Sequence, residues 1–141
     1  FMKGANWIPC SAFDAAQTPE RYRDLLKSAA AANMNMIRLW GGGQYEKDVF
    51  YDLCDELGLL IWHDQMFACA VYPVEHADFV SLDERECAHQ IRRLRDHASI
   101  ALWCGGNECK TPVAVQRAAV SKYDPQRIFW PSSPPSKQIH A

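Results

Sequence analysis

The sequence predicts an α/β fold in which helices cover a parallel sheet. First, apolar runs of strand length alternate with amphipathic helical patterns about five times along the 141 residues; this is typical of parallel strands joined by right-handed helical crossovers. Second, the run Leu59–Trp62 is apolar throughout, as expected of a strand buried on both faces. Third, each predicted strand contains one of the five tryptophans. Such a sheet either stays open and doubly wound or closes into a barrel.

The first predicted strand is the apolar run Lys3–Pro9, and a helix follows it. Thr18 is a suitable N-cap, and Pro19 fits the first helical turn because its missing N–H would have no partner there. Asn33 is a suitable end for this helix. Five apolar residues are expected on its inward face: Tyr22, Leu25, Leu26, Ala29 and Ala30.

The second predicted strand is Met34–Trp40, and three consecutive glycines follow it. The run Gly41–Gly43 lacks the Lys and Ser or Thr of a phosphate loop, and no G-x-G-x-x-G opens the first helix. The glycines therefore favour a tight turn over a nucleotide site. The next helix is expected to end before Gly58, which suits a left-handed cap. Its apolar face comprises Phe50, Leu53, Cys54 and Leu57.

The second half of the chain continues the alternation. We expect a helix over Asp83–Arg95, a strand over Ile100–Cys104, a weaker helix over Val113–Lys122 and a strand over Ile128–Trp130. In the first of these helices the inward residues are expected to be Cys87, Ile91 and Leu94, and the solvent-facing ones Arg92, Arg93 and Arg95.

The composition excludes several classes of partner and ligand. The 15 Lys and Arg residues against 17 Asp and Glu give a net charge of -2, which lacks the basic excess of a nucleic-acid-binding protein. No apolar run approaches the ~20 residues that cross a membrane. The six cysteines are scattered without a C-x-x-C pair, so we expect buried structural thiols and no metal site. We expect no cofactor either. No basic-then-apolar leader is visible.

Polar side chains gather at the carboxyl ends of the predicted strands. Arg38, Asp64, Asn107 and Glu108 lie in or just after them. Parallel α/β folds form their sites at these ends because the loops converge there. His63 adjoins this set, and a core or rim position is favoured for it over a place in the pocket.

The tryptophans have two uses in such a fold. We expect Trp62 and Trp103 to fill the core between the sheet and the helices. Trp7, Trp40 and Trp130 lie nearer the strand ends, where they either fill the core as well or offer an indole face to the C–H face of a sugar ring.

Glu108 also has two interpretations. It follows a buried strand by way of Gly105 and Gly106, which permit close approach, so its carboxyl group can serve as a general acid. Alternatively, Glu108 begins the next helix, where an acidic residue suits the positive end of the helix dipole.

Longer motifs carry a family resemblance over nearly the whole chain. In order, they resemble those of the β-mannosidases of glycoside hydrolase family 2. The resemblance implies a catalytic (β/α)8 TIM barrel and hydrolysis of terminal non-reducing β-D-mannose residues from β-mannosides with retention. The motifs are KGANWIP (Lys3–Pro9), MNMIRLWGGG (Met34–Gly43), FYDLCDELGLLIWHD (Phe50–Asp64), MFACAVYP (Met66–Pro73), IALWCGGNE (Ile100–Glu108) and YDPQRIFWPSSP (Tyr123–Pro134).

The resemblance also implies roles for individual residues. Glu108 resembles the general acid/base, and Asn107 the residue that binds the 2-hydroxyl beside the anomeric carbon. Arg38 corresponds to the arginine that orients the nucleophile carboxylate. The residues expected to line the subsite for the terminal mannose are Trp40, Asp64 and Trp7.

Some positions depart from the family pattern. Gly106 stands where the family usually has Asn, Cys10–Ser11 where an acidic residue often follows, and Gln65 where an aromatic residue is usual. The segment after Glu108 is shorter than in the family. The nucleophilic glutamate of the family lies on a later strand, which this chain does not reach.

We therefore expect residues 1–141 to form a partial glycoside hydrolase TIM-barrel domain, roughly the first five β/α units. The chain would carry the acid/base but not the nucleophile, and alone it would be inactive. Its expected partners are a β-mannoside oligosaccharide and the rest of the enzyme. Two alternatives stay open: a non-catalytic mannoside-binding or partner-binding module, and a related family 2 β-galactosidase or β-glucuronidase. The sequence also leaves open the aglycone and the compartment, whether lysosomal, periplasmic or cytoplasmic.

Overall fold

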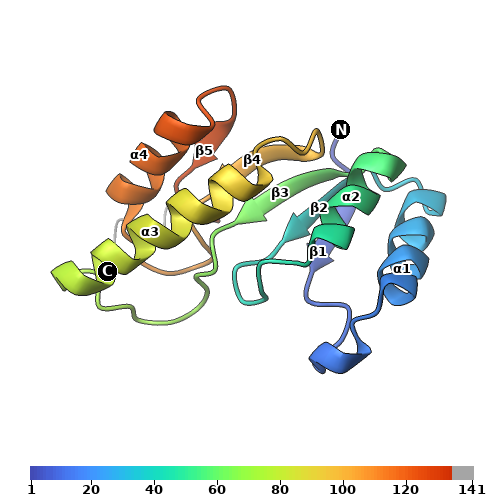
Figure 1. The fold of residues 1–141 in the computed structure, drawn as a ribbon, viewed down its shortest axis with the longest axis horizontal. Helices are drawn as coiled ribbons and strands as arrows, with labels where there is room; N and C mark the ends of the chain where they lie inside the picture. The colour runs from blue at the N-terminus through green and yellow to red at the C-terminus, as the bar shows by residue number, and fades with distance from the viewer. Residues whose placement is uncertain (135–141) are drawn as a thin grey trace.

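A computed structural model describes residues 1–134, so positions 135–141 of the expected domain lie outside the described residues. Residues 1–134 contain one sheet of five parallel strands in the order β1-β2-β3-β4-β5 (Figure 1). The prediction of a parallel α/β fold is confirmed. Strictly sequential order with right-handed crossovers places the helices on one face, so these strands are singly wound. The strands are β1 (Gly4–Trp7), β2 (Met36–Leu39), β3 (Leu60–Asp64), β4 (Ile100–Cys104) and β5 (Ile128–Trp130).

In the described part of the chain four α-helices connect the strands, and a short 3-10 turn, η1 (Asp14–Ala16), precedes the first. Two predicted caps are confirmed. The Thr18 hydroxyl accepts a hydrogen bond from the Arg21 N–H at 3.3 Å, and Gly58 ends the second helix with φ 68°. Helices α1 and α2 pack together, as do α3 and α4 (Figure 1). The helices are α1 (Pro19–Ala31), α2 (Asp48–Leu57), α3 (Ala77–Leu94) and α4 (Val113–Tyr123).

Helix α3 differs from its prediction in two respects. It begins at Ala77 rather than Asp83, and Phe79 in its first turns packs edge-on against the Phe67 ring, with centroids 6.1 Å apart. Arg93 does not point freely to solvent: it is half-buried and donates to the Glu46 carbonyl oxygen at 2.6 Å. The long stem of arginine lets it cover the ring of Tyr51, 5.4 Å from the guanidinium carbon.

The hydrophobic core lies between the sheet and the helices and includes the fully buried Trp103, as predicted. Three other predictions about the core are wrong. Leu25, expected on the inward face of α1, is 41% exposed, whereas Tyr22 and Leu26 of that face are buried. Trp62 is half-buried on the opposite face of the sheet, and Leu60 of the same strand is 43% exposed. The register of β3 against β4 shifts between Ile61 and Trp62, so the faces of the two strands are not related by simple alternation.

All six cysteines are free thiols, and five of them are buried as expected. The exception is Cys69, which is exposed and adopts a left-handed φ of 51°. Within residues 1–134 no helix is both long enough and apolar enough to span a membrane.

Candidate active site

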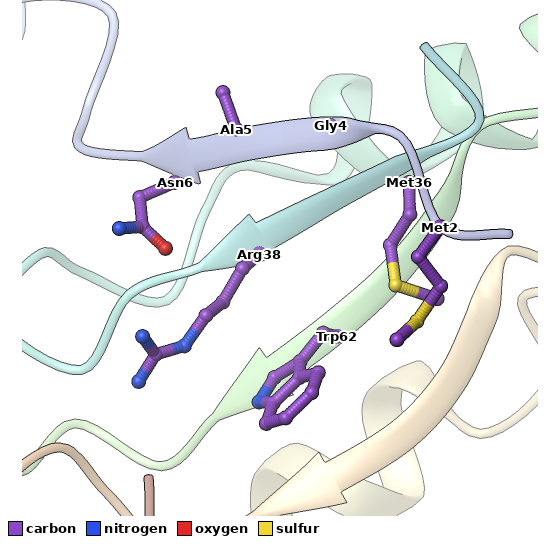
Figure 2. Close-up of a pocket in the computed structure, with 7 residues that line it drawn as sticks. All are labelled: Met2, Gly4, Ala5, Asn6, Met36, Arg38 and Trp62. Carbon is purple, nitrogen blue, oxygen red and sulfur yellow. The ribbon is translucent and has the colours of Figure 1, made fainter. Parts of the chain in front are cut away.

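A hollow of about 360 Å³ lies on the sheet face that the helices leave uncovered. Asn6, Arg38 and Trp62 project into it from three neighbouring strands, whereas Ala5 points away (Figure 2). The parallel register explains the grouping, because Asn6 pairs with Arg38 and Arg38 with Trp62, so the three share one face.

An ion pair joins the ends of β2 and β3 beside this hollow. The Arg38 guanidinium donates to both carboxylate oxygens of Asp64, from Nη2 at 2.7 Å and from Nε at 3.3 Å. The Asp64 side chain is fully buried and that of Arg38 is 18% exposed. A bidentate pair of this kind fixes the plane of the guanidinium.

Two further donors complete the surroundings of Asp64. The indole N–H of Trp62 donates at 3.0 Å and the backbone N–H of Gly41 at 3.1 Å. Burial raises the pKa of Asp64, while the guanidinium and the Gly41 N–H oppose the rise. The guanidinium, the indole and the Gly41 backbone together direct four N–H donors at the carboxylate, and the Cys104 side chain contributes a further hydrogen bond. Gly41 is required for this approach, because a Cβ there would lie 2.3 Å from the Phe67 carbonyl oxygen.

Asn107 brings the end of β4 into the same network. Its side-chain oxygen accepts from Arg38 Nη2 at 2.9 Å. Its backbone bridges the segments after β3 and β5, pairing with Ala68 on one side and Ser133 on the other. Arg38, Asp64 and Asn107 were predicted to gather at the carboxyl ends of neighbouring strands, and the structure confirms that they meet.

Glu108 follows directly and is exposed at this edge of the sheet. It has a left-handed φ of 52°, and its backbone N–H donates to the Ser133 carbonyl oxygen at 3.1 Å. The alternative that Glu108 begins the next helix is wrong, because α4 starts only at Val113.

Trp40 and Trp7, both expected to line the mannose subsite, lie in different surroundings. Trp40 is half-buried and lies over Gly42, where an added Cβ would come within 2.0 Å of its ring. Trp7 lies on the helix side of the sheet: its ring stacks near Tyr22, with centroids 6.2 Å apart, and its indole N–H donates to Glu46 at 2.9 Å. The structure thus gives Trp7 a core position, since it follows Asn6 in β1 and faces the other way.

Asp64 was also expected to line the subsite, but its side chain is fully buried beneath Arg38 and forms no exposed surface of the hollow.

His63 occupies the core, as favoured from the sequence. Its Nδ1 lies 2.8 Å from the Asp64 carbonyl oxygen, which can only accept, so Nδ1 carries the proton. Nε2 then accepts from the Tyr51 hydroxyl at 3.0 Å. Burial lowers the pKa of His63 to about 3, and the ring is neutral at pH 7.

This buried histidine predicts a loss of stability in mild acid. The unfolded chain binds a proton at His63 near pH 6.5, whereas the folded chain binds it only near pH 3, so acid favours unfolding below pH 6.5. Between pH 7 and pH 5 this linkage amounts to about 2 kcal/mol. Urea unfolding at pH 7 and pH 5 measures this effect. The decrease in the free energy of unfolding between the two pH values should be about 2 kcal/mol smaller in His63→Gln than in the parent. His89→Gln, at an exposed position of α3, is the control and should behave like the parent; equal sensitivity in all three would contradict the assignment.

Sequence reasoning missed three contributors to the site. Asn6 lies in a short strand, and only the pairing register with β2 shows which face of the sheet its side chain is on. A polar residue between Ala5 and Trp7 could nevertheless have indicated that this position is not in the core. Gly41 acts through its backbone N–H, and Cys69 through contacts described below. Within residues 1–134 no group of three or more His, Cys, Asp or Glu side chains is placed to hold a metal ion.

The chain is similar in sequence and in fold to known β-mannosidases. A β-mannosidase of Capra hircus is 54% identical over 108 residues, which are 77% of this chain and 12% of that protein. The crystal structure of the β-D-mannosidase of Dictyoglomus thermophilum superposes with a TM-score of 0.89 and 43% identity, over 95% of this chain and 19% of its own. The chain is homologous to the β-mannosidases. It spans less than a fifth of the length of either relative.

Other comparisons of this β-mannosidase homologue are less specific. A β-glucuronidase of Bacteroides uniformis superposes with a TM-score of 0.74 at 24% identity, over 91% of this chain and 18% of its own. That likeness extends to the fold alone. No family model matches the chain.

Proposed function

We propose that this chain carries the acid/base half of the active site of a retaining β-mannosidase of glycoside hydrolase family 2. One observation carries the proposal: in a homologue of β-mannosidases, Glu108 follows Asn107, whose amide is bonded to the Arg38–Asp64 pair at the ends of three adjacent parallel strands. Terminal β-D-mannose of an oligosaccharide is the proposed substrate.

In this mechanism Glu108 protonates the oxygen of the departing group and later removes a proton from the attacking water. Retention needs a second carboxylate, about 5 Å from the first, as the nucleophile. Asp64 is unsuited to that task, since it is fully buried and all its donors hold it in place. The nucleophile is therefore assigned to a strand beyond the five described, in a sheet that continues to a closed (β/α)8 barrel.

The roles of the neighbours follow from their contacts. Arg38 holds Asn107 and, as a cation beside the hollow, is suited to orient the nucleophile carboxylate. Asn107 is proposed to bind the 2-hydroxyl, and Trp40 to flank the terminal mannose. Asp64 acts beneath them by fixing Arg38. Residues 1–141 are proposed to be one partial barrel domain.

The test uses a barrel-completed chain, in which this sequence replaces its matching segment in the Dictyoglomus thermophilum enzyme. We expect hydrolysis of an aryl β-mannoside at least about a hundredfold faster than of the matching β-galactoside or β-glucuronide, because polar groups built for one hydroxyl pattern are left unpaired by another. Proton NMR should detect β-mannose as the first product.

The control is the same enzyme with its segment deleted, which should be inactive. Inversion at the anomeric carbon, or a preference for the β-galactoside or β-glucuronide, would contradict the proposal. Binding of mannoside without turnover by the barrel-completed chain would favour the non-catalytic alternative.

A further inference from the structure

Cys69 makes two hydrogen bonds to Asn107 across 38 residues of sequence. The Asn107 side-chain nitrogen donates to the Cys69 sulfur at 3.3 Å, and the Cys69 backbone N–H donates to the Asn107 carbonyl oxygen at 2.9 Å. We propose that Cys69 is a positioning residue that determines which atoms of the Asn107 amide face the hollow.

The donor and acceptor chemistry of the three partners permits one orientation of the amide. A guanidinium can only donate, so the atom of Asn107 next to Arg38 Nη2, at 2.9 Å, must be the oxygen. The amide nitrogen then faces Cys69, and the sulfur accepts through a lone pair. One of the two N–H bonds of the amide is used by the sulfur, and the other is left for a ligand.

Both restraints are needed to hold that orientation. With Arg38 alone, the amide keeps a bond to its oxygen but has freedom to rotate its nitrogen out of the hollow. The sulfur restrains the opposite end of the same planar group. The backbone bond from Cys69 keeps the sulfur at this position, with the φ of 51° that the turn requires.

The consequence for catalysis rests on the proposed function. If Asn107 donates to the 2-hydroxyl, loss of the Cys69 acceptor lowers the fraction of enzyme that presents the N–H correctly. Hydrogen bonds to a sugar that strengthen in the transition state act on kcat more than on KM. We expect a decrease in kcat of about threefold to tenfold, the range of one neutral hydrogen bond.

The first experiment reads the hydrogen bond without any activity. In the 15N-labelled chain, the Asn107 side-chain NH2 signals are assigned by their absence in Asn107→Asp. Cys69→Ala should shift one of the two protons upfield and speed its exchange about threefold to tenfold, while Cys69→Ser should restore both. Cys69→Gly, which accepts a positive φ, repeats the test if the Ala variant misfolds. Unchanged signals in the Ala and Gly variants would overturn the proposal.

The second experiment measures the kinetics of the barrel-completed chain. Cys69→Ala should lower kcat on a β-mannoside about threefold to tenfold with little change in KM or in the pH profile, and Cys69→Ser should recover most of it. On the 2-deoxy-β-mannoside the same variant should match the parent. Val71→Ala, at a fully exposed position of the same segment, is the control and should have no effect.

The outcomes separate the two proposals. Equal loss on both substrates, or no loss on either, would overturn the positioning role of Cys69. Failure of the parent barrel-completed chain to hydrolyse any β-mannoside would overturn the proposed function instead, and the NMR result would still decide whether Cys69 holds the Asn107 amide.

Discussion

Glu108→Gln in the barrel-completed chain is expected to lower kcat/KM about 10²- to 10⁴-fold for a β-mannoside with a poor leaving group, such as a mannobioside. An amide cannot deliver a proton to the glycosidic oxygen, and such a leaving group does not depart without one. A 2,4-dinitrophenyl leaving group departs without a proton. On that substrate the formation of the covalent glycosyl-enzyme should therefore slow less than about tenfold.

The contrast between the two substrates identifies the role of Glu108. Glu84→Gln, an exposed carboxylate of α3, is the matched control and should leave both rates unchanged. Equal losses on both leaving groups would contradict the acid/base assignment and would favour a binding or structural role for Glu108.

Arg38→Met is expected to lower the free energy of unfolding by about 3–5 kcal/mol, because it leaves the fully buried Asp64 carboxylate without its counter-charge. Urea unfolding of the chain at pH 7 measures this loss. The matched control is Arg23→Met, which breaks the exposed pair with Glu56 and should cost less than about 1 kcal/mol.

Two further measurements fix the cause. Burial already raises the pKa of Asp64 in the parent, and loss of Arg38 removes a group that opposes this rise, so the pKa of folded Asp64 moves further above its unfolded value. The variant should therefore lose more stability than the parent as pH rises, and should recover part of the difference at lower pH. The double variant Arg38→Met, Asp64→Leu removes both charges and should regain most of the loss. A cost no greater than that of Arg23→Met, with no pH dependence, would contradict the buried-pair account.

The sequence predicted the ends of helices where a single residue type determines the cap. Thr18 and Gly58 could be identified as caps because a hydroxyl acceptor and a residue tolerant of positive φ have few other uses at those positions. The start of α3 could not be found in this way, since His76 caps it without a side-chain hydrogen bond. The facing of Trp62 was also hidden, because the run Leu59–Trp62 is apolar at every position and so shows no alternation between the two faces of the sheet.

The candidate site was partly predictable for a related reason. Parallel strands end at one edge, so Arg38, Asp64 and Asn107 could be grouped without knowing any contact. Which of them is exposed depends on packing, and Asp64 proved to lie below Arg38. Cys69 lies on an irregular segment, and its contact with Asn107 joins two loops that no periodic pattern relates.

The backbone around Asn107 has a consequence for how the site meets its ligand. The Asn107 backbone N–H donates to the Phe67 carbonyl oxygen at 2.8 Å. On the other side, the Ser133 N–H donates to the Gly106 carbonyl oxygen at 3.0 Å, and the Ser133 carbonyl oxygen accepts from the Glu108 N–H at 3.1 Å. These hydrogen bonds fix the backbone of the segment in the free protein. Ordering a loop costs about 1–2 kcal/mol per residue, and here none of that cost falls on binding. Under the proposed function, a sugar with a misplaced hydroxyl would meet a backbone that is already fixed by these bonds, so this part of the selectivity would be set in the free protein.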